Sequence, residues 1–279
     1  MTAAARARET HARSRRVRLR LNAYLAYATA GARQEIAARP ALVGRAAFLV
    51  VILFVFSRLW DRVFAAETLG GRTQGELLWY IAVTEWIVLS FPYIHVEMEN
   101  DLRSGDLVAR LSQPVSYVGA RLAEAAGGAV VRLGLFGLVA ASVAAVFTGG
   151  LPASPGGLLL AVPLGLMGTA LALLTVGAIG MCAVWLHDTS PVFWIWQKLA
   201  FMFGGLLLPL DIYPAWLQRV ASWTPFAAMI NGPGRMALGF EPFVAVRLAC
   251  ELTAWLLVGA IGLRWLSARA LRAMDGHGG

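Results

Sequence analysis

Charged residues are scarce in this sequence. Aspartate, glutamate, lysine and arginine make up 14% of the 279 residues, whereas hydrophobic residues make up 58%. An ordinary soluble domain carries about 25% charged residues, so this composition argues against a soluble globular protein. It indicates a chain that lies mostly within a lipid bilayer.

Metal-ligating and nucleophilic residues are also few. The two cysteines, Cys182 and Cys250, each lie in an apolar run, and the four histidines stand far apart. Metal sites need several such ligands at short spacing. No Ser/His/Asp or paired-carboxylate arrangement has a spacing that favours catalysis. We therefore expect no metal site and no enzyme active site on this chain.

Lysine occurs once, as Lys198 in WIWQKLAFM. A phosphate-cradling loop needs a glycine-rich turn before its lysine, and no such turn precedes Lys198. If ATP drives this protein, another chain must bind it. We therefore expect no cofactor on this chain.

Long apolar runs are what the sequence has in abundance. A helix needs about 20 apolar residues to cross about 30 Å of hydrocarbon. Six runs are near that length: residues 41–59, 76–96, 123–148, 157–186, 192–210 and 243–266. We predict an all-α membrane protein with six transmembrane helices, which form one membrane domain over residues 41–266 and leave a tail at 267–279.

The distribution of arginine predicts the topology. The first 20 residues contain seven arginines and no apolar core of a cleavable signal peptide. Arg264, Arg269 and Arg272 lie at the end of the last run and beyond it, whereas residues 149–156 have no lysine or arginine. The positive-inside rule then places both termini in the cytoplasm. We expect the membrane to be a bacterial inner membrane. The formal charge of +8 reflects this topology and lipid headgroups, and we expect no nucleic-acid partner.

Residues 1–40 are predicted to be a basic tail followed by an amphipathic helix on the inner surface. Leu21, Tyr24, Leu25, Ala28, Ala32 and Ile36 recur at helical spacing. Pro40 should break this helix from the first span, although a cytoplasmic extension of that span is the alternative. We expect residues 1–20 to be disordered.

A polar segment, VEMENDLRSGDLVARLSQPVSY at residues 96–117, lies between the second and third runs. Glu97, Glu99 and Asp101 suit the start of a short helix, which Ser104-Gly105 would end. A second short helix, residues 106–111, would stop at Pro114. Such an element is either a docking site for a partner or a solvated cap on the loop.

The same segment resembles a signature of type-2 ATP-binding-cassette permeases, particularly the branch grouped with viologen exporters. The matching residues are Glu97-Met98-Glu99, Arg103-Ser104-Gly105-Asp106, Leu111 and Pro114-Val115-Ser116. In that family this loop contains the coupling helix, which sits in a groove of the ATPase. The resemblance implies that the coupling residues are Glu97, Glu99, Asp101, Arg103 and Gly105.

The segment at residues 205–239, between the fifth and sixth runs, is predicted to be a re-entrant element on the outer side. Its four prolines forbid one continuous helix, yet it is apolar enough to lie against lipid. It is similar to the family's outer lid in Gly205, Pro209, Pro214, Trp216, Pro225, Phe226 and Pro233. The predicted lid residues are Pro209, Tyr213, Pro214, Trp216, Pro225 and Phe226. A structural plug without a gating role is the alternative.

Glu85 lies in the middle of the second run, where an ionisable group costs about 2.5–3.5 kcal/mol. Arg132 or Lys198 could pair with it. Glu85, Trp86 and Arg132 are therefore candidates for a pathway that takes an organic cation. A structural pair between Glu85 and Arg132, or a protonated Glu85, is the other interpretation.

Together, these features predict the permease subunit of an ATP-driven exporter, which moves a small amphiphilic or cationic compound such as a drug, antibiotic or toxin. The resemblance implies two cytoplasmic ATPase subunits as partners, coupled through residues 97–114, and a second permease, either identical or homologous. A proton-coupled secondary carrier that uses Glu85 or Glu124 is the alternative. The sequence does not identify the cargo.

Overall fold

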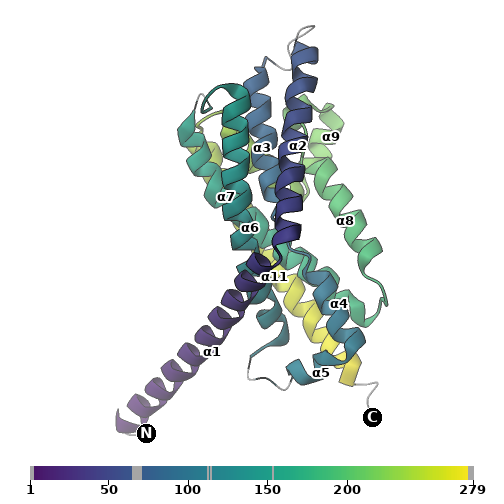
Figure 1. Ribbon diagram of the computed structural model, residues 1–279. Coiled ribbons are helices and arrows are strands. Elements are labelled where there is room, and N and C mark those ends of the chain that lie inside the picture. The colour runs from purple at the N-terminus through teal and green to yellow at the C-terminus, as the bar shows by residue number, and fades with distance from the viewer. Residues whose placement is uncertain (1–2, 65–70, 112, 114, 153, 276–279) are drawn as a thin grey trace.

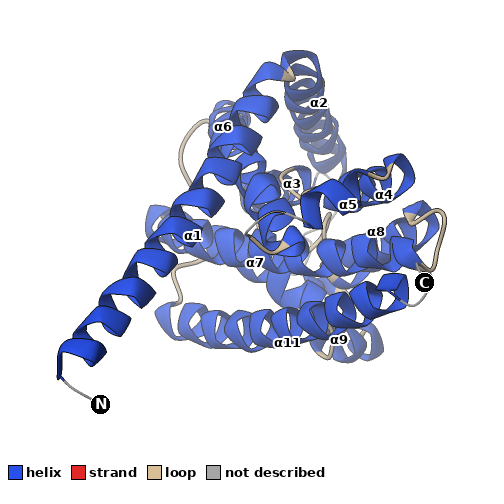
Figure 2. Ribbon diagram, turned by 90° about the horizontal axis from the view of Figure 1, so that it is seen from below, coloured by secondary structure: helices blue, strands red, loops and turns tan. Residues whose placement is uncertain are grey.

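The computed structural model describes residues 3–64, 71–111, 113, 115–152 and 154–275. Within these ranges the chain is built from helices and contains no β-strand (Figures 1 and 2). The expected all-α class is therefore confirmed.

Five helical segments are long and apolar enough to cross a membrane. They are Arg39–Val63, Gln74–Ser104, Tyr117–Thr148, Pro155–Val184 and Pro242–Met274. They comprise α2 (Arg39–Phe64), α3 (Gln74–Leu89) with α4 (Ile94–Ser104), α6 (Tyr117–Thr148), α7 (Pro155–Met181) with a short 3₁₀ turn, and α11 (Pro242–Asp275). Their length and composition indicate a membrane-embedded protein.

The fifth of the six predicted runs is different. It corresponds to α8 (Ser190–Phe203), which has 14 residues and therefore a length of about 21 Å. That is shorter than the hydrocarbon core of a bilayer, about 30 Å. Glycines 204 and 205 follow, with Gly205 at φ +63°, and the chain turns away from the helix axis there. The structure thus provides five full-length candidate spans and one shorter helix.

Helix α1 (Ala3–Ala37) leaves the bundle obliquely, and the chain breaks at Ala38 before α2 begins (Figure 1). Pro40 lies in the first turn of α2, where its missing N–H would have no helical acceptor. The predicted break is confirmed. The expected disorder of residues 1–20 is wrong for residues 3–20, which belong to α1. Residues 1 and 2 lie outside the described residues.

Two glycines bring α1 and α6 into close contact. A Cβ atom on Gly31 would lie 1.9 Å from the Glu124 carbonyl oxygen, and one on Gly127 would lie 1.8 Å from the Ala28 carbonyl oxygen. Both distances are far below van der Waals contact. The crossing therefore requires glycine at these two positions.

Helix α3 is the centre of the bundle. In the span that begins with it, 83% of the most apolar window is buried, compared with 17–44% in the other four spans. It packs against α2, α6 and α10 (Gly232–Leu238). Polar groups on α3 are consequently surrounded by protein rather than by lipid.

The two ends of the bundle carry different elements. Both chain ends and α5 (Asp106–Leu111) lie toward one end, and α9 (Ala215–Ser222) lies at the other (Figure 1). We refer to these as the α4 end and the α9 end. The arrangement places the predicted coupling segment and both termini on the same side of the bundle.

Candidate functional site

The predicted coupling segment forms a bent pair of helices, α4 and α5, which we call the elbow (residues 94–111). Helix α4 ends at Gly105, which adopts a left-handed conformation with φ +79°. The Ser104 hydroxyl donates to an Asp106 carboxylate oxygen at 2.9 Å, and α5 begins at Asp106. Ser104-Gly105 therefore ends the first helix as predicted. Pro114, the expected stop after the second helix, lies outside the described residues.

Asp101 attaches the elbow to the start of α6. Arg121 on α6 pairs with both carboxylate oxygens and donates from Nε at 2.7 Å, and the Tyr117 hydroxyl donates at 2.8 Å. Arg110 on α5 adds an ion pair at 3.3 Å. Asp101 is only 4% exposed and Arg121 only 5%. A buried carboxylate with this many donors is well compensated.

Glu99 attaches the same elbow to the link between α7 and α8. The Thr189 backbone N–H and hydroxyl both donate to Glu99 Oε2, at 2.9 and 2.7 Å. Arg103 forms an ion pair with Oε1 at 2.7 Å and also donates to the His187 carbonyl oxygen. Hydrogen bonds from Ser190 hold the pKa of the neighbouring Asp188 carboxyl below its usual range. The link between α7 and α8 is therefore held to the elbow by charged and polar groups of both segments.

These contacts divide the five predicted coupling residues into two groups. Glu97, Arg103 and Gly105 are exposed, and the Glu97 and Arg103 side chains are 54% and 58% accessible. Glu99 and Asp101 are buried and face their own chain. Direct partner contact by Glu99 and Asp101 does not fit the structure, because their carboxylates are already occupied by internal donors.

The predicted lid is a series of short helical pieces, as its prolines require. They are a 3₁₀ turn at Leu210–Ile212, α9, a π-helical turn at Ala227–Asn231 and α10. Pro214 and Trp216 are exposed, Tyr213 and Pro225 are half-buried, and Pro209 and Phe226 are buried. The 3₁₀ turn and α9 thus cover the α9 end. The second part, with Met229, Ile230 and Met236 fully buried, enters the core.

Three polar residues that the sequence analysis did not select hold this segment. The Tyr80 hydroxyl donates to the Gly205 carbonyl and lies 3.0 Å from the Asn231 side-chain oxygen. That oxygen also accepts the Leu210 N–H at 3.1 Å. The Thr84 hydroxyl lies 2.7 Å from the Leu206 carbonyl oxygen. Tyr80 and Thr84 stand one helical turn apart in a run whose other central residues, Glu85 apart, are apolar, which is a signal that could have identified them.

The three predicted pathway residues do not meet at one site. Glu85 is 3% exposed, and no ion pair or hydrogen bond of its carboxylate is found among the described residues. Arg132 pairs instead with Glu35 on α1 and lies 3.3 Å from the Ser90 carbonyl oxygen. The predicted Glu85–Arg132 pair is therefore wrong, because α1 supplies the acid that Arg132 needs.

Lys198 is not the partner of Glu85 either. Its ammonium lies 5.5 and 5.6 Å from the ring centres of Trp194 and Phe201. Trp86 donates from Nε1 to the Leu133 carbonyl oxygen at 2.7 Å and borders an apolar cavity of about 420 Å³ between α3, α6 and α7. Trp86 thus has an apolar environment that does not include Arg132.

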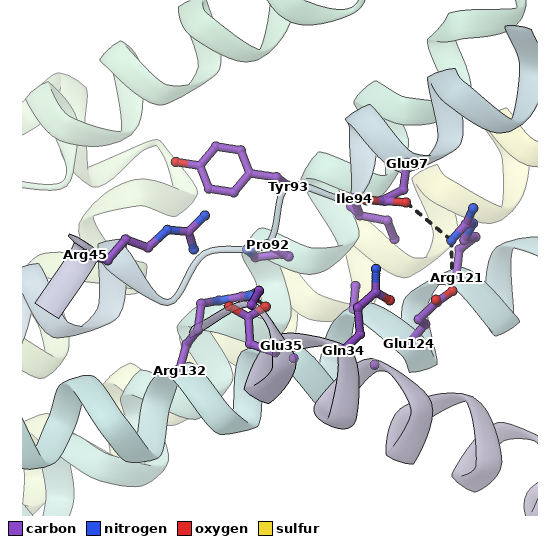
Figure 3. A pocket seen from close by; sticks show the side chains of 14 residues that line it. Gln34, Glu35, Arg45, Pro92, Tyr93, Ile94, Glu97, Arg121, Glu124 and Arg132 are labelled. Carbon is purple, nitrogen blue, oxygen red and sulfur yellow. Dashed lines mark hydrogen bonds and ion pairs between the residues drawn. The ribbon is translucent and has the colours of Figure 1, made fainter. Parts of the chain in front are cut away.

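A polar pocket lies where α1, α2, α4 and α6 meet, and Figure 3 shows the side chains that line it. Arg121 bridges Glu97 at 3.7 Å and Glu124 at 2.9 Å along one wall. The Glu35–Arg132 pair forms the floor in this view. The described residues contain no group of three or more histidine, cysteine, aspartate or glutamate side chains that could hold a metal ion.

Comparison with known proteins does not assign a family. No protein-family model matches this chain, and no curated protein matches it.

Proposed function

We propose that this chain is the permease subunit of an ATP-driven exporter for a small amphiphilic or cationic organic compound. A separate ATPase, which would bind ATP and Mg²⁺, contacts the elbow, and a second permease completes the transport path. In this proposal helix α8, although short, supplies the sixth crossing. The assembly resides in a bacterial inner membrane with both termini in the cytoplasm.

One observation carries this proposal: the elbow is attached to two different parts of the bundle by buried charge. Asp101 joins it to α6 through Arg121, and Glu99 joins it to the α7–α8 link through Thr189. A force applied to the elbow would therefore move α6 and α8 together. Charged networks of this kind resist separation because each partner left alone in a buried site is costly.

The exposed face of the elbow is suited to a protein partner. Glu97, Arg103 and Asp106 present charges of both signs, and Gly105 forms a side-chain-free turn between them. Opposite charges arranged on a short rigid element give specificity in recognition. The lid lies at the α9 end, so the partner surface and the lid lie at opposite ends of the bundle (Figure 1).

The experiment is co-purification with an ATPase subunit, sought first among the products of the reading frames that neighbour this gene. A variant with Glu97→Arg and Asp106→Arg reverses two exposed charges and leaves the Arg103–Glu99 attachment intact, and we expect it to insert normally but to lose the ATPase. Glu241→Arg is the matched control, because Glu241 is also exposed but lies before α11, away from the elbow. Unchanged ATPase recovery with the double variant would contradict the proposal.

A proton-coupled carrier is the second candidate, and the isolation of Glu85 supports it. A buried carboxylate without a partner favours its neutral form and can exchange a proton. Transport in reconstituted vesicles separates the two functions. Export that survives ATP depletion, stops when the proton gradient is dissipated and is lost in Glu85→Gln would favour the carrier.

A further inference from the structure

The polar pocket contains one arginine that has no acid of its own. Its volume is about 240 Å³, and three arginines and three glutamates line it: Arg45, Arg121, Arg132, Glu35, Glu97 and Glu124. Glu35 pairs with Arg132, and both Glu97 and Glu124 pair with Arg121. Each carboxylate is thus already shared with an arginine other than Arg45.

Arg45 is left with an unsatisfied donor. Its Nη1 atom is buried and has no hydrogen-bond partner among the described residues. The guanidinium carbon lies 5.1 Å from the centre of the Tyr93 ring, a cation–π contact that orients the group but accepts no hydrogen bond. In Figure 3 the Arg45 side chain reaches toward Tyr93 and Pro92, above the Glu35–Arg132 pair. A buried guanidinium donor without an acceptor is unfavourable, so an acceptor from outside the chain is expected.

We propose that Arg45 binds a phosphate group in this pocket. The planar fork of a guanidinium matches two phosphate oxygens, and such charge-assisted bonds are the strongest that arginine makes. A single water takes up about 30 Å³ in the liquid, so the pocket has room for a group of phosphate size. Ala38, Pro92 and Ile94 also line the pocket and add apolar surface, which suits the acyl chains that a phospholipid carries beside its phosphate.

The position of the pocket favours a phospholipid headgroup as the source of the phosphate. Arg45 lies six residues after Arg39, where the first candidate span begins, and therefore about 9 Å along the helix. The headgroup and interfacial layer is about 5–7 Å thick on each side of the hydrocarbon core, so the Arg45 backbone lies just inside that core, a depth from which a long arginine side chain reaches back to the headgroups. The break between α1 and α2 opens the pocket beside the start of that span.

The test uses the full-length protein, purified in detergent and stripped of lipid. Native mass spectrometry compares its binding of phosphatidylglycerol with that of a diacylglycerol that has the same acyl chains but no phosphate. A thermal-shift titration with inorganic phosphate tests the free ion. Arg45→Gln removes the fork, and Arg58→Gln is the matched control, because Arg58 is an exposed arginine at the opposite end of the same helix.

We expect the unaltered protein to hold one phosphatidylglycerol in preference to diacylglycerol, and Arg45→Gln to bind it about tenfold more weakly. Arg58→Gln should bind as the unaltered protein does. Stabilisation by inorganic phosphate that is lost in Arg45→Gln would identify the free ion as the source. Equal binding by Arg45→Gln overturns the proposal. The proposal is also overturned if the unaltered protein neither prefers phosphatidylglycerol to diacylglycerol nor is stabilised by phosphate. That outcome does not depend on whether a variant folds.

Discussion

At the scale of single residues, buried polar groups determine how this membrane protein is held together. Asp101 and Thr84 are examples of the two kinds of buried polar group, one charged and one neutral. Asp101 is charged and has three donor side chains, whereas Thr84 offers one hydroxyl to a backbone carbonyl of a distant segment. Both are buried, so the loss of either group should be measurable as a change in stability.

Replacement of Asp101 by asparagine should destabilise the protein strongly. Arg121, which is 5% exposed, would keep Glu124 and the more distant Glu97 as acidic partners but would lose the Asp101 carboxylate. Loss of hydrogen bonds to a buried charged group costs about 1.5–3 kcal/mol. Thermal unfolding in detergent measures the effect. Glu97→Gln is the control, because Glu97 is exposed and its loss should change stability by less than about 0.5 kcal/mol. Equal unfolding temperatures for the two variants would contradict the assignment of Asp101 as a structural anchor.

Thr84→Val should loosen the segment that follows α8. The change keeps the shape of the side chain but removes the hydroxyl that lies 2.7 Å from the Leu206 carbonyl oxygen. A buried carbonyl left without its donor costs about 1–3 kcal/mol. Thr253→Val provides the comparison, because Thr253 is exposed and its hydroxyl bonds only within its own helix. The assignment fails if hydrogen exchange at residues 204–210 is equally slow in both variants.

At the scale of elements, the crossing of α1 and α6 depends on the absence of side chains. Gly127→Ala and Gly134→Ala are the same substitution on the same helix in different surroundings. A Cβ at 127 would lie 1.8 Å from the Ala28 carbonyl oxygen, whereas one at 134 would meet nothing within 4 Å. Helix propensity alone should favour alanine by about 1 kcal/mol at either position. We therefore expect changes in stability of opposite sign.

Limited proteolysis provides the measurement for this pair of variants. Displacement of α1 by Gly127→Ala should expose the break at Ala38 to cleavage, and Gly134→Ala should cleave as the unaltered protein does. If neither variant is cleaved faster than the unaltered protein, the position of α1 does not depend on this contact.

The elements were predictable where a local signal ends or begins a helix. Pro40 separates α1 from α2, Ser104-Gly105 divides the elbow, and the prolines of the outer segment open its short helices. The partners of buried polar groups were not predictable, because they come from distant parts of the chain. Arg132 finds Glu35, 97 residues away, and Glu99 finds Thr189, 90 residues away. A run of apolar letters likewise does not reveal that α8 stops after 14 residues.

At the scale of the whole molecule, the buried ion pairs of the elbow lie at one end of the bundle and the proline-rich segment lies at the other. The elbow and both chain ends lie at the α4 end, and α9 lies at the other (Figure 1). Helices α6 and α8 run between the two, and the elbow is attached to the beginning of each through Arg121 and Thr189. In the proposed mechanism, a push at the elbow would have a continuous path of packed helices toward the proline-rich segment.

Photo-crosslinking in intact cells tests this account most directly, with a photoreactive amino acid placed at position 97 in one sample and at position 216 in another. Both positions are exposed, one on the elbow and one on α9. We predict that position 97 crosslinks to a cytoplasmic ATPase and that position 216 does not. The account would be contradicted if position 97 crosslinked to no nucleotide-binding protein and a membrane-impermeant reagent labelled that position from outside the cell.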